Sequence, residues 1–166
     1  LILIIILYLN QVFIAEAAPV PSYGGLTRWE ITEGSSIVYY YIDSSDITFI
    51  NASKEAFEKW ESVESAYISF KQVASASEAG ITIKVYSSIS NSFAAGQAVS
   101  KTDGKNKIIR CEVQLTGTAT SNEVSLKHVL LHEIGHCLCL DHSVISGAIM
   151  SYRSSYSLTL TDDDVY

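Results

Sequence analysis

Proline, glycine and charge are all scarce in this chain of 166 residues, which has two prolines, nine glycines and charged side chains at 17% of its positions. The low proline and glycine content excludes a fibrous protein, and the low charge combined with 48% hydrophobic residues excludes intrinsic disorder. The sequence has no basic stripe, and its formal net charge of −7 argues against a nucleic-acid partner. We therefore expect one globular domain with a core of ordinary size.

The apolar residues are concentrated at the start of the chain, where residues 1–18 contain 15 of them. This run and the small residues that end it are typical of a secretory signal peptide, here truncated at its start because no methionine or basic leader precedes it. The expected organisation is a signal peptide at 1–18, a linker at 19–28 and one domain at 29–166. An uncleaved membrane anchor and a buried strand are the alternatives. A cleaved signal predicts a secreted protein without stable membrane insertion, and a monomer is expected.

Hydrophobic periodicity predicts a sheet of five strands. The strands are expected at residues 36–42, 67–73, 80–86, 97–101 and 107–115. The first of them is β-branched and aromatic on both faces, which suggests a central strand that is covered on each side.

Helical spacing of apolar residues predicts long helices at 51–63 and 122–139. The first would be capped by Asn51 or Ser53, although Asn51-Ala52-Ser53 is also a glycosylation sequon. The second would open with a capping box at 120–123. Acidic residues after Thr161 predict the start of a further helix, which the end of the sequence cuts off.

The three cysteines are an odd set, so at most one intrachain disulfide can form. Cys111 shares one face of its strand with Val113 and Leu115 and is expected to point into the core. Its favoured partner is Cys137 on the following helix, provided that the chain folds in an oxidising compartment. The alternative is that these cysteines pack as small apolar side chains without a bond.

Three histidines and a glutamate lie close together in the sequence, in His132-Glu133-Ile134-Gly135-His136 and at His142. Residues four apart on a helix lie about 40° around the axis and about 6 Å along it, so His132 and His136 project from one face. Two such imidazoles can share a metal ion. Zinc suits nitrogen ligands, and catalytic zinc sites combine three protein ligands with an open position. The sequence therefore predicts one Zn²⁺ site.

The third ligand is expected to be His142. On a continuous helix it would lie about 120° from His136 and about 9 Å further along, out of reach of a shared ion. The chain must therefore turn sharply near Cys139. Glu133 then remains available as a general base, which would take a proton from a zinc-activated water and return it to the leaving amine. His128 is too far away to bind the ion and is expected on the helix surface.

These residues resemble the metzincin metalloproteases, whose pattern is H-E-x-x-H-x-x-G-x-x-H followed by a methionine turn. The order of elements from residue 28 to residue 166 is similar to that of the matrixins within this clan. The resemblance implies an α+β, zincin-like domain: a twisted, mostly parallel mixed sheet of five strands, two long helices and a short C-terminal subdomain. It also implies that Met150, the only methionine, supports the metal site without bonding the metal.

Four features differ from the matrixin pattern. Met150-Ser151-Tyr152 is more similar to the serralysins, which implies that Tyr152 is an additional ligand or an oxyanion donor; a packed turn residue is the alternative. The family's glycine is replaced by Cys139, and a left-handed backbone at a non-glycine residue costs roughly 1–2 kcal/mol. The histidines that hold a second, structural zinc in many matrixins are missing, and cleavage after residue 18 is expected to leave no room for their pro-segment before Trp29.

The sequence is therefore interpreted as a secreted zinc endopeptidase that cleaves protein or peptide substrates. The strand at 97–101 is a weaker candidate for an exposed edge that pairs with the substrate. One rival is a catalytically inactive zinc-binding or partner-binding module, which the substitution at Cys139 favours. A second rival is a zinc hydrolase that acts on non-peptide amides with the same groups.

Overall fold

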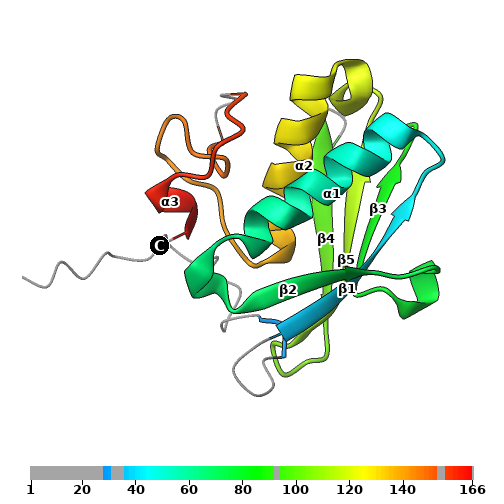
Figure 1. The fold of residues 1–166 in the computed structure, drawn as a ribbon, viewed down its shortest axis with the longest axis vertical. Helices are drawn as coiled ribbons and strands as arrows, with labels where there is room; N and C mark the ends of the chain where they lie inside the picture. The colour runs from blue at the N-terminus through cyan, green and yellow to red at the C-terminus, as the bar shows by residue number, and fades with distance from the viewer. Residues whose placement is uncertain (1–27, 31–35, 92–93, 153–155, 166) are drawn as a thin grey trace, which may run out of the picture.

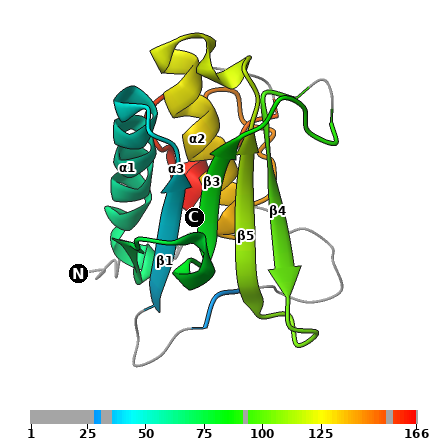
Figure 2. The same cartoon turned by 90° about the vertical axis from the view of Figure 1, so that its right-hand side faces the viewer.

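The computed structural model describes residues 28–30, 36–91, 94–152 and 156–165. Two helices lie together against one face of a five-stranded sheet, and a short third helix follows near the C-terminus (Figures 1 and 2). The expected signal peptide and most of the expected linker lie outside the described residues. Within the described residues, no helix combines the length and the hydrophobicity that crossing a membrane requires.

The sheet is mostly parallel, as predicted, and its strand order is β2-β1-β3-β5-β4. Only β4 runs antiparallel, alongside β5, and it forms one edge of the sheet next to the second long helix. Each strand falls within two residues of its expected bounds: β1 Ser36–Asp43, β2 Ile68–Gln72, β3 Ile81–Val85, β4 Gly96–Thr102 and β5 Ile108–Leu115. The predicted α+β fold class is therefore confirmed.

The first long helix, α1, spans Ile47–Glu61 and begins four residues earlier than predicted. Its N-cap is Asp46, whose Oδ1 accepts from the backbone N–H groups of Thr48 at 2.8 Å and Phe49 at 3.2 Å. The prediction that Asn51 or Ser53 caps this helix is therefore wrong. The first turn contains β-branched and aromatic residues, which have low helix propensity, so the sequence pattern did not predict a helix there. Glycosylation of the exposed Asn51 stays a prediction.

The second long helix, α2, spans Glu123–Cys137 and carries the histidine motif. Its N-cap is Asn122, whose Oδ1 accepts from Ser125 N–H at 2.9 Å. The predicted capping box is wrong, because Thr120 lies in a preceding 3₁₀ turn and donates its hydroxyl to the carbonyl of Gly117. The helix starts where it was expected, with a different residue as the cap.

The hydrophobic core lies between the helices and one face of the sheet. On β1 the burial alternates, with Val38, Tyr40 and Ile42 buried under α1 while Ile37 is 60% and Tyr39 is 42% exposed. The prediction that this strand is covered on both sides is therefore wrong. β-branched and aromatic residues suit a strand on either face, so their presence on the second face does not require a covering layer.

The short helix α3, Asp162–Val165, fixes the segment that passes beneath α2. The buried carboxylate of Asp164 accepts from Ile149 N–H at 3.1 Å, from Met150 N–H at 2.8 Å and from Thr161 through its N–H and its hydroxyl. One carboxylate thus ties the C-terminal segment to the methionine turn. This anchor was not predicted from the sequence.

We expect Asp164→Asn to lower the free energy of unfolding by about 2–3 kcal/mol. The amide has one accepting oxygen in place of two and would turn an N–H₂ group towards backbone N–H donors. Urea denaturation followed by circular dichroism measures the change. Asp162→Asn, at an exposed position of the same helix, is the control and should stay within about 0.5 kcal/mol of the parent. Equal effects of the two substitutions would contradict the assigned role.

Candidate metal centre

The three predicted histidine ligands converge at the end of a cleft beside β4. The Nε2 atom of His132 lies 3.1 Å from the Nε2 of His136 and 3.1 Å from that of His142, and the remaining pair is 3.2 Å apart. Among the described residues, they form the one group of histidine, cysteine or acidic side chains that could hold a metal ion. The cleft encloses 580 Å³ and is also lined by residues 94–98 of the β4 segment.

The hydrogen bonds of the other ring nitrogens define which tautomer two of these histidines adopt. His132 Nδ1 lies 2.8 Å from the carbonyl of Ile149, and His136 Nδ1 lies 2.8 Å from the carbonyl of Leu140. Because a carbonyl oxygen can only accept, each Nδ1 carries the proton and donates it. Each neutral ring then directs the lone pair of Nε2 at the other rings, which is the arrangement of a metal-binding histidine.

The donor set fits zinc in both spacing and chemistry. Two Zn–N bonds of 2.0–2.1 Å that meet near the tetrahedral angle place their nitrogens about 3.3 Å apart, close to the spacing of the three Nε2 atoms. Burial lowers the pKa of His132 to about 4 and also lowers the pKa of His136, so both rings are held in the neutral, ligating form. The Nε2 lone pairs of His132 and His136 meet the Nε2 atom of His142, and a cation at this point can be bound by all three nitrogens.

The chain reverses direction directly after α2, and this reversal brings His142 to the other two rings. Cys139 has a left-handed backbone with φ of 72°. Its N–H donates to the carbonyl of His136 at 3.0 Å, and Leu140 N–H donates to the carbonyl of Gly135 at 3.1 Å. These two bonds define a Schellman motif, which usually has glycine at the left-handed position. The sharp turn predicted near Cys139 is present with the cysteine in place.

Glu133 is buried next to the first histidine and faces β4. It accepts a hydrogen bond from the backbone N–H of Ala98, and burial nevertheless raises its pKa to about 7. Gly96 makes room for it, because a Cβ at residue 96 would lie 3.1 Å from the Oε1 atom of Glu133. The carboxylate is therefore confined between helix and edge strand and lines the same cleft as the histidines.

Met150 lies beneath the histidines and is 1% exposed. It packs directly against Gly135 of α2, where a Cβ would overlap its Sδ atom. Its carbonyl accepts from Ser143 N–H at 2.7 Å, which joins this turn to the chain just after His142. The turn thus contacts the segments that carry all three rings. The single glycine inside α2 was the sequence signal for this close approach, since glycine in a helix interior usually has a packing reason.

The remaining predicted residues lie as follows. Tyr152 lines the cleft with its side chain 55% exposed. A disulfide joins Cys111 in β5 to Cys137, the last residue of α2. His128 is 7% exposed and hydrogen bonds through Nδ1 to the carbonyl of Ser157 at 2.8 Å, so the prediction that it lies on the helix surface is wrong. The segment that covers it comes from far along the chain, which helical periodicity cannot reveal.

A comparison with protein families agrees with this geometry. The sequence model of one family, described as Matrixin, matches residues 29–166. A search of the curated proteins finds no match. The matched range includes all elements of the fold, the three histidines and the methionine turn.

We expect Gly135→Ala to lower the free energy of unfolding by about 1–3 kcal/mol, because the new methyl group overpacks the buried contact with Met150. Zinc affinity should fall as well, since the displaced turn carries the Ile149 carbonyl that orients His132. Thermal denaturation and a competitive zinc titration measure the two effects. The control is Gly117→Ala, where a Cβ meets nothing within 4 Å. Unchanged zinc affinity in Gly135→Ala would contradict the supporting role of the turn.

Proposed function

The chain belongs to the matrixin family of zinc metalloproteases, and from that premise we propose that it is a secreted zinc-dependent endopeptidase whose metal is held by His132, His136 and His142. The observation that carries this proposal is the convergence of the three Nε2 atoms within 3.1–3.2 Å of one another. When bound, zinc would supply Lewis-acid chemistry, polarising a substrate carbonyl and acidifying a water. One zinc ion per chain is proposed.

Glu133 is the proposed general base. Its side chain lies in the cleft beside the first ligand, and burial makes its carboxylate more basic than that of an exposed glutamate. It would take a proton from the attacking water and later deliver that proton to the amine that leaves. The N–H of Ala98 holds the carboxylate in place during both transfers.

The edge strand β4 is proposed to position the peptide substrate. It forms one edge of the sheet, and residues 94–98 line the cleft beside the histidines. An extended peptide could pair with this edge through backbone hydrogen bonds and so lie across the metal site. Tyr152, on the cleft wall, is the candidate for a further polar contact to the reacting carbonyl, as a ligand or as an oxyanion donor.

The proposed organisation follows the same premise. Residues 1–18 would direct the chain to secretion, residues 19–28 would link the signal to the domain, and residues 29–166 would form the catalytic domain, the range that the family matches. The disulfide suits an oxidising, extracellular compartment. The proposed protein acts as a monomer on protein or peptide substrates.

An inactive zinc-binding or partner-binding module is the rival that Cys139 favours. The Schellman motif around this residue supports the enzyme instead, because it accommodates the cysteine while the rings stay together. A hydrolase of non-peptide amides would use the same residues, so only the identity of the cleaved substrate distinguishes it from the proposed endopeptidase. Both alternatives are outcomes of the tests that follow.

Removal of the metal is expected to abolish cleavage of a broad peptide library, and one equivalent of zinc should restore it. Metal analysis of the purified protein should find one zinc ion per chain. Cleavage that survives complete chelation would refute the proposed mechanism. A zinc-loaded protein that cuts no peptide, but retains a partner after chelation, would identify the binding module. Hydrolysis confined to non-peptide amides would identify the second rival.

Glu133→Gln should lower kcat/KM for a cleaved peptide by about 10²–10⁴-fold, because the amide cannot take up the proton. Zinc affinity should be unchanged or higher, since the three imidazoles remain. Peptide cleavage and zinc titration on the same preparation measure the two quantities. Glu123→Gln, an exposed position of the same helix, is the matched control and should cleave normally. Full activity in Glu133→Gln would eliminate this residue as the base.

A further inference from the structure

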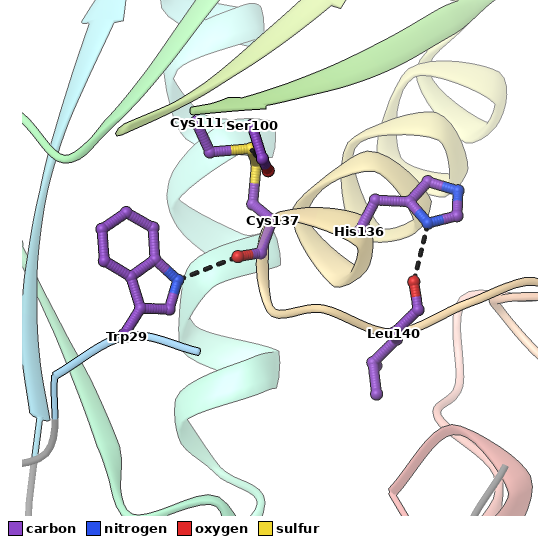
Figure 3. The surroundings of a disulfide bond; sticks show 6 residues. All are labelled: Trp29, Ser100, Cys111, His136, Cys137 and Leu140. Atoms are coloured by element: carbon purple, nitrogen blue, oxygen red, sulfur yellow. Dashed lines mark hydrogen bonds between the residues drawn. A yellow bond between two sulfur atoms is a disulfide. The ribbon is translucent and has the colours of Figure 1, made fainter. Parts of the chain in front are cut away.

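The last turn of α2 is held by two long-range contacts that the proposed reaction does not use (Figure 3). The disulfide links Cys137 to Cys111 of β5, with the Cα atoms 5.7 Å apart and a sequence separation of 26. The indole N–H of Trp29 donates to the carbonyl of Cys137 at 2.8 Å. Both cysteines are buried. We refer to Trp29, Cys111 and Cys137 together as the clamp.

The clamp acts where the metal-binding helix changes into the reversing turn. Cys137 directly follows His136, and the left-handed Cys139 lies two residues further along. The carbonyl of Leu140, at the end of the turn, accepts from His136 Nδ1 at 2.8 Å, as Figure 3 shows. A shift of the helix end would therefore move one ligand, release its orienting carbonyl and change the path of the chain to His142.

The turn is an unfavourable conformation for its sequence. A glycine would adopt the left-handed backbone freely, whereas Cys139 is disfavoured there by contact between its Cβ and the backbone. The two hydrogen bonds of the Schellman motif stabilise the left-handed backbone of Cys139, but they join only residues of the helix end and the turn. The clamp adds a covalent bond to the sheet and a hydrogen bond to Trp29. Both are made by Cys137, the residue directly before the turn.

We propose that the clamp is a positioning element of the metal site, which keeps the turn at 138–140 in the conformation that brings His142 to the other two histidines. The inference rests on the proposed function, because it takes the three histidines to be the zinc ligands. Without the clamp, residue 139 relaxes in part of the population. Only the fraction with the reversed turn binds zinc with all three rings, and the apparent affinity falls in proportion.

Zinc capture is thereby tied to the oxidation of Cys111 and Cys137. Forming the S–S bond removes two protons and two electrons from the two thiols, and a small-molecule or protein disulfide accepts them and becomes two thiols. An oxidising compartment supplies such disulfides, whereas a reducing one opposes the reaction. The metal site is therefore completed once the chain meets oxidising conditions, which would limit activity before secretion.

The test compares zinc affinities of folded variants by competition with a chromophoric chelator. The double variant Cys111→Ala/Cys137→Ala should bind zinc about 10–100-fold more weakly than the parent, the usual effect of losing support around a metal ligand. Adding Cys139→Gly to this variant should restore most of the affinity, because glycine removes the conflict in the turn. A disulfide that only stabilises the fold would show no such rescue.

Phe57→Leu is the matched control for a general loss of stability. This residue is 1% exposed and stacks on Tyr40 of β1 in the core. The substitution should lower the unfolding temperature while zinc affinity stays within about twofold, since truncating a core side chain acts on stability. Circular dichroism at the temperature of the titration verifies that every variant is folded.

Trp29→Phe tests the clamp if the double variant does not fold. It keeps the disulfide, removes the indole N–H, and should weaken zinc binding about two- to tenfold, as expected for one hydrogen bond. Parent-like affinity in the folded double variant, or failure of Cys139→Gly to rescue a weakened one, overturns the inference. Parent-like affinity in Trp29→Phe overturns it if the double variant is unfolded. A parent protein that binds no zinc instead overturns the proposed function.

Discussion

The site depends on the reversal of the chain at Cys139. A helix places His132 and His136 side by side through its geometry alone, but a third ligand from the same segment is available only if the helix stops and turns back. The hydrogen bond from His136 Nδ1 to the carbonyl of Leu140 couples the turn to this histidine. The turn therefore also determines which tautomer the His136 ring adopts. The end of the helix, the orientation of His136 and the position of His142 therefore all depend on the same turn.

A second unit supports the site from the C-terminal side. Asp164 binds the backbone N–H groups of Ile149 and Met150, and the carbonyl of Ile149 accepts from His132 Nδ1. The Met150 side chain then fills the space that Gly135 leaves on α2. His132 and His136 are thus each oriented by a carbonyl from a different later segment. Metal-binding histidines commonly depend on such outer contacts, and here they extend to the end of the described chain.

The sequence predicted what local patterns determine. Alternating and helical periods gave the strands and both long helices, and the distance from His136 to His142 required a break near Cys139. The Cys111–Cys137 disulfide was the one long-range contact with a sequence signal. The segment over His128 and the carboxylate of Asp164 come from distant parts of the chain and had none. Caps were misassigned because several polar residues near each helix start could serve, and the first helix begins early enough for Asp46 to be its cap. The open face of β1 was missed because strand propensity does not report burial.

The electrostatics of the cleft connect the donor set with the proposed base. The same burial lowers the pKa of His132 and raises the pKa of Glu133, because a poorly solvated cleft disfavours charge on either group. Protonating one ring at Nε2 would place a positive charge beside the Nε2 atoms of the other rings. That ring would then lose the lone pair with which it could bind a metal ion. A divalent cation satisfies all the lone pairs and leaves each ring neutral, and its charge favours the ionised carboxylate that a base requires. The arrangement of donors thus suits a metal ion better than a proton, and the burial that keeps His132 and His136 neutral also raises the pKa of Glu133.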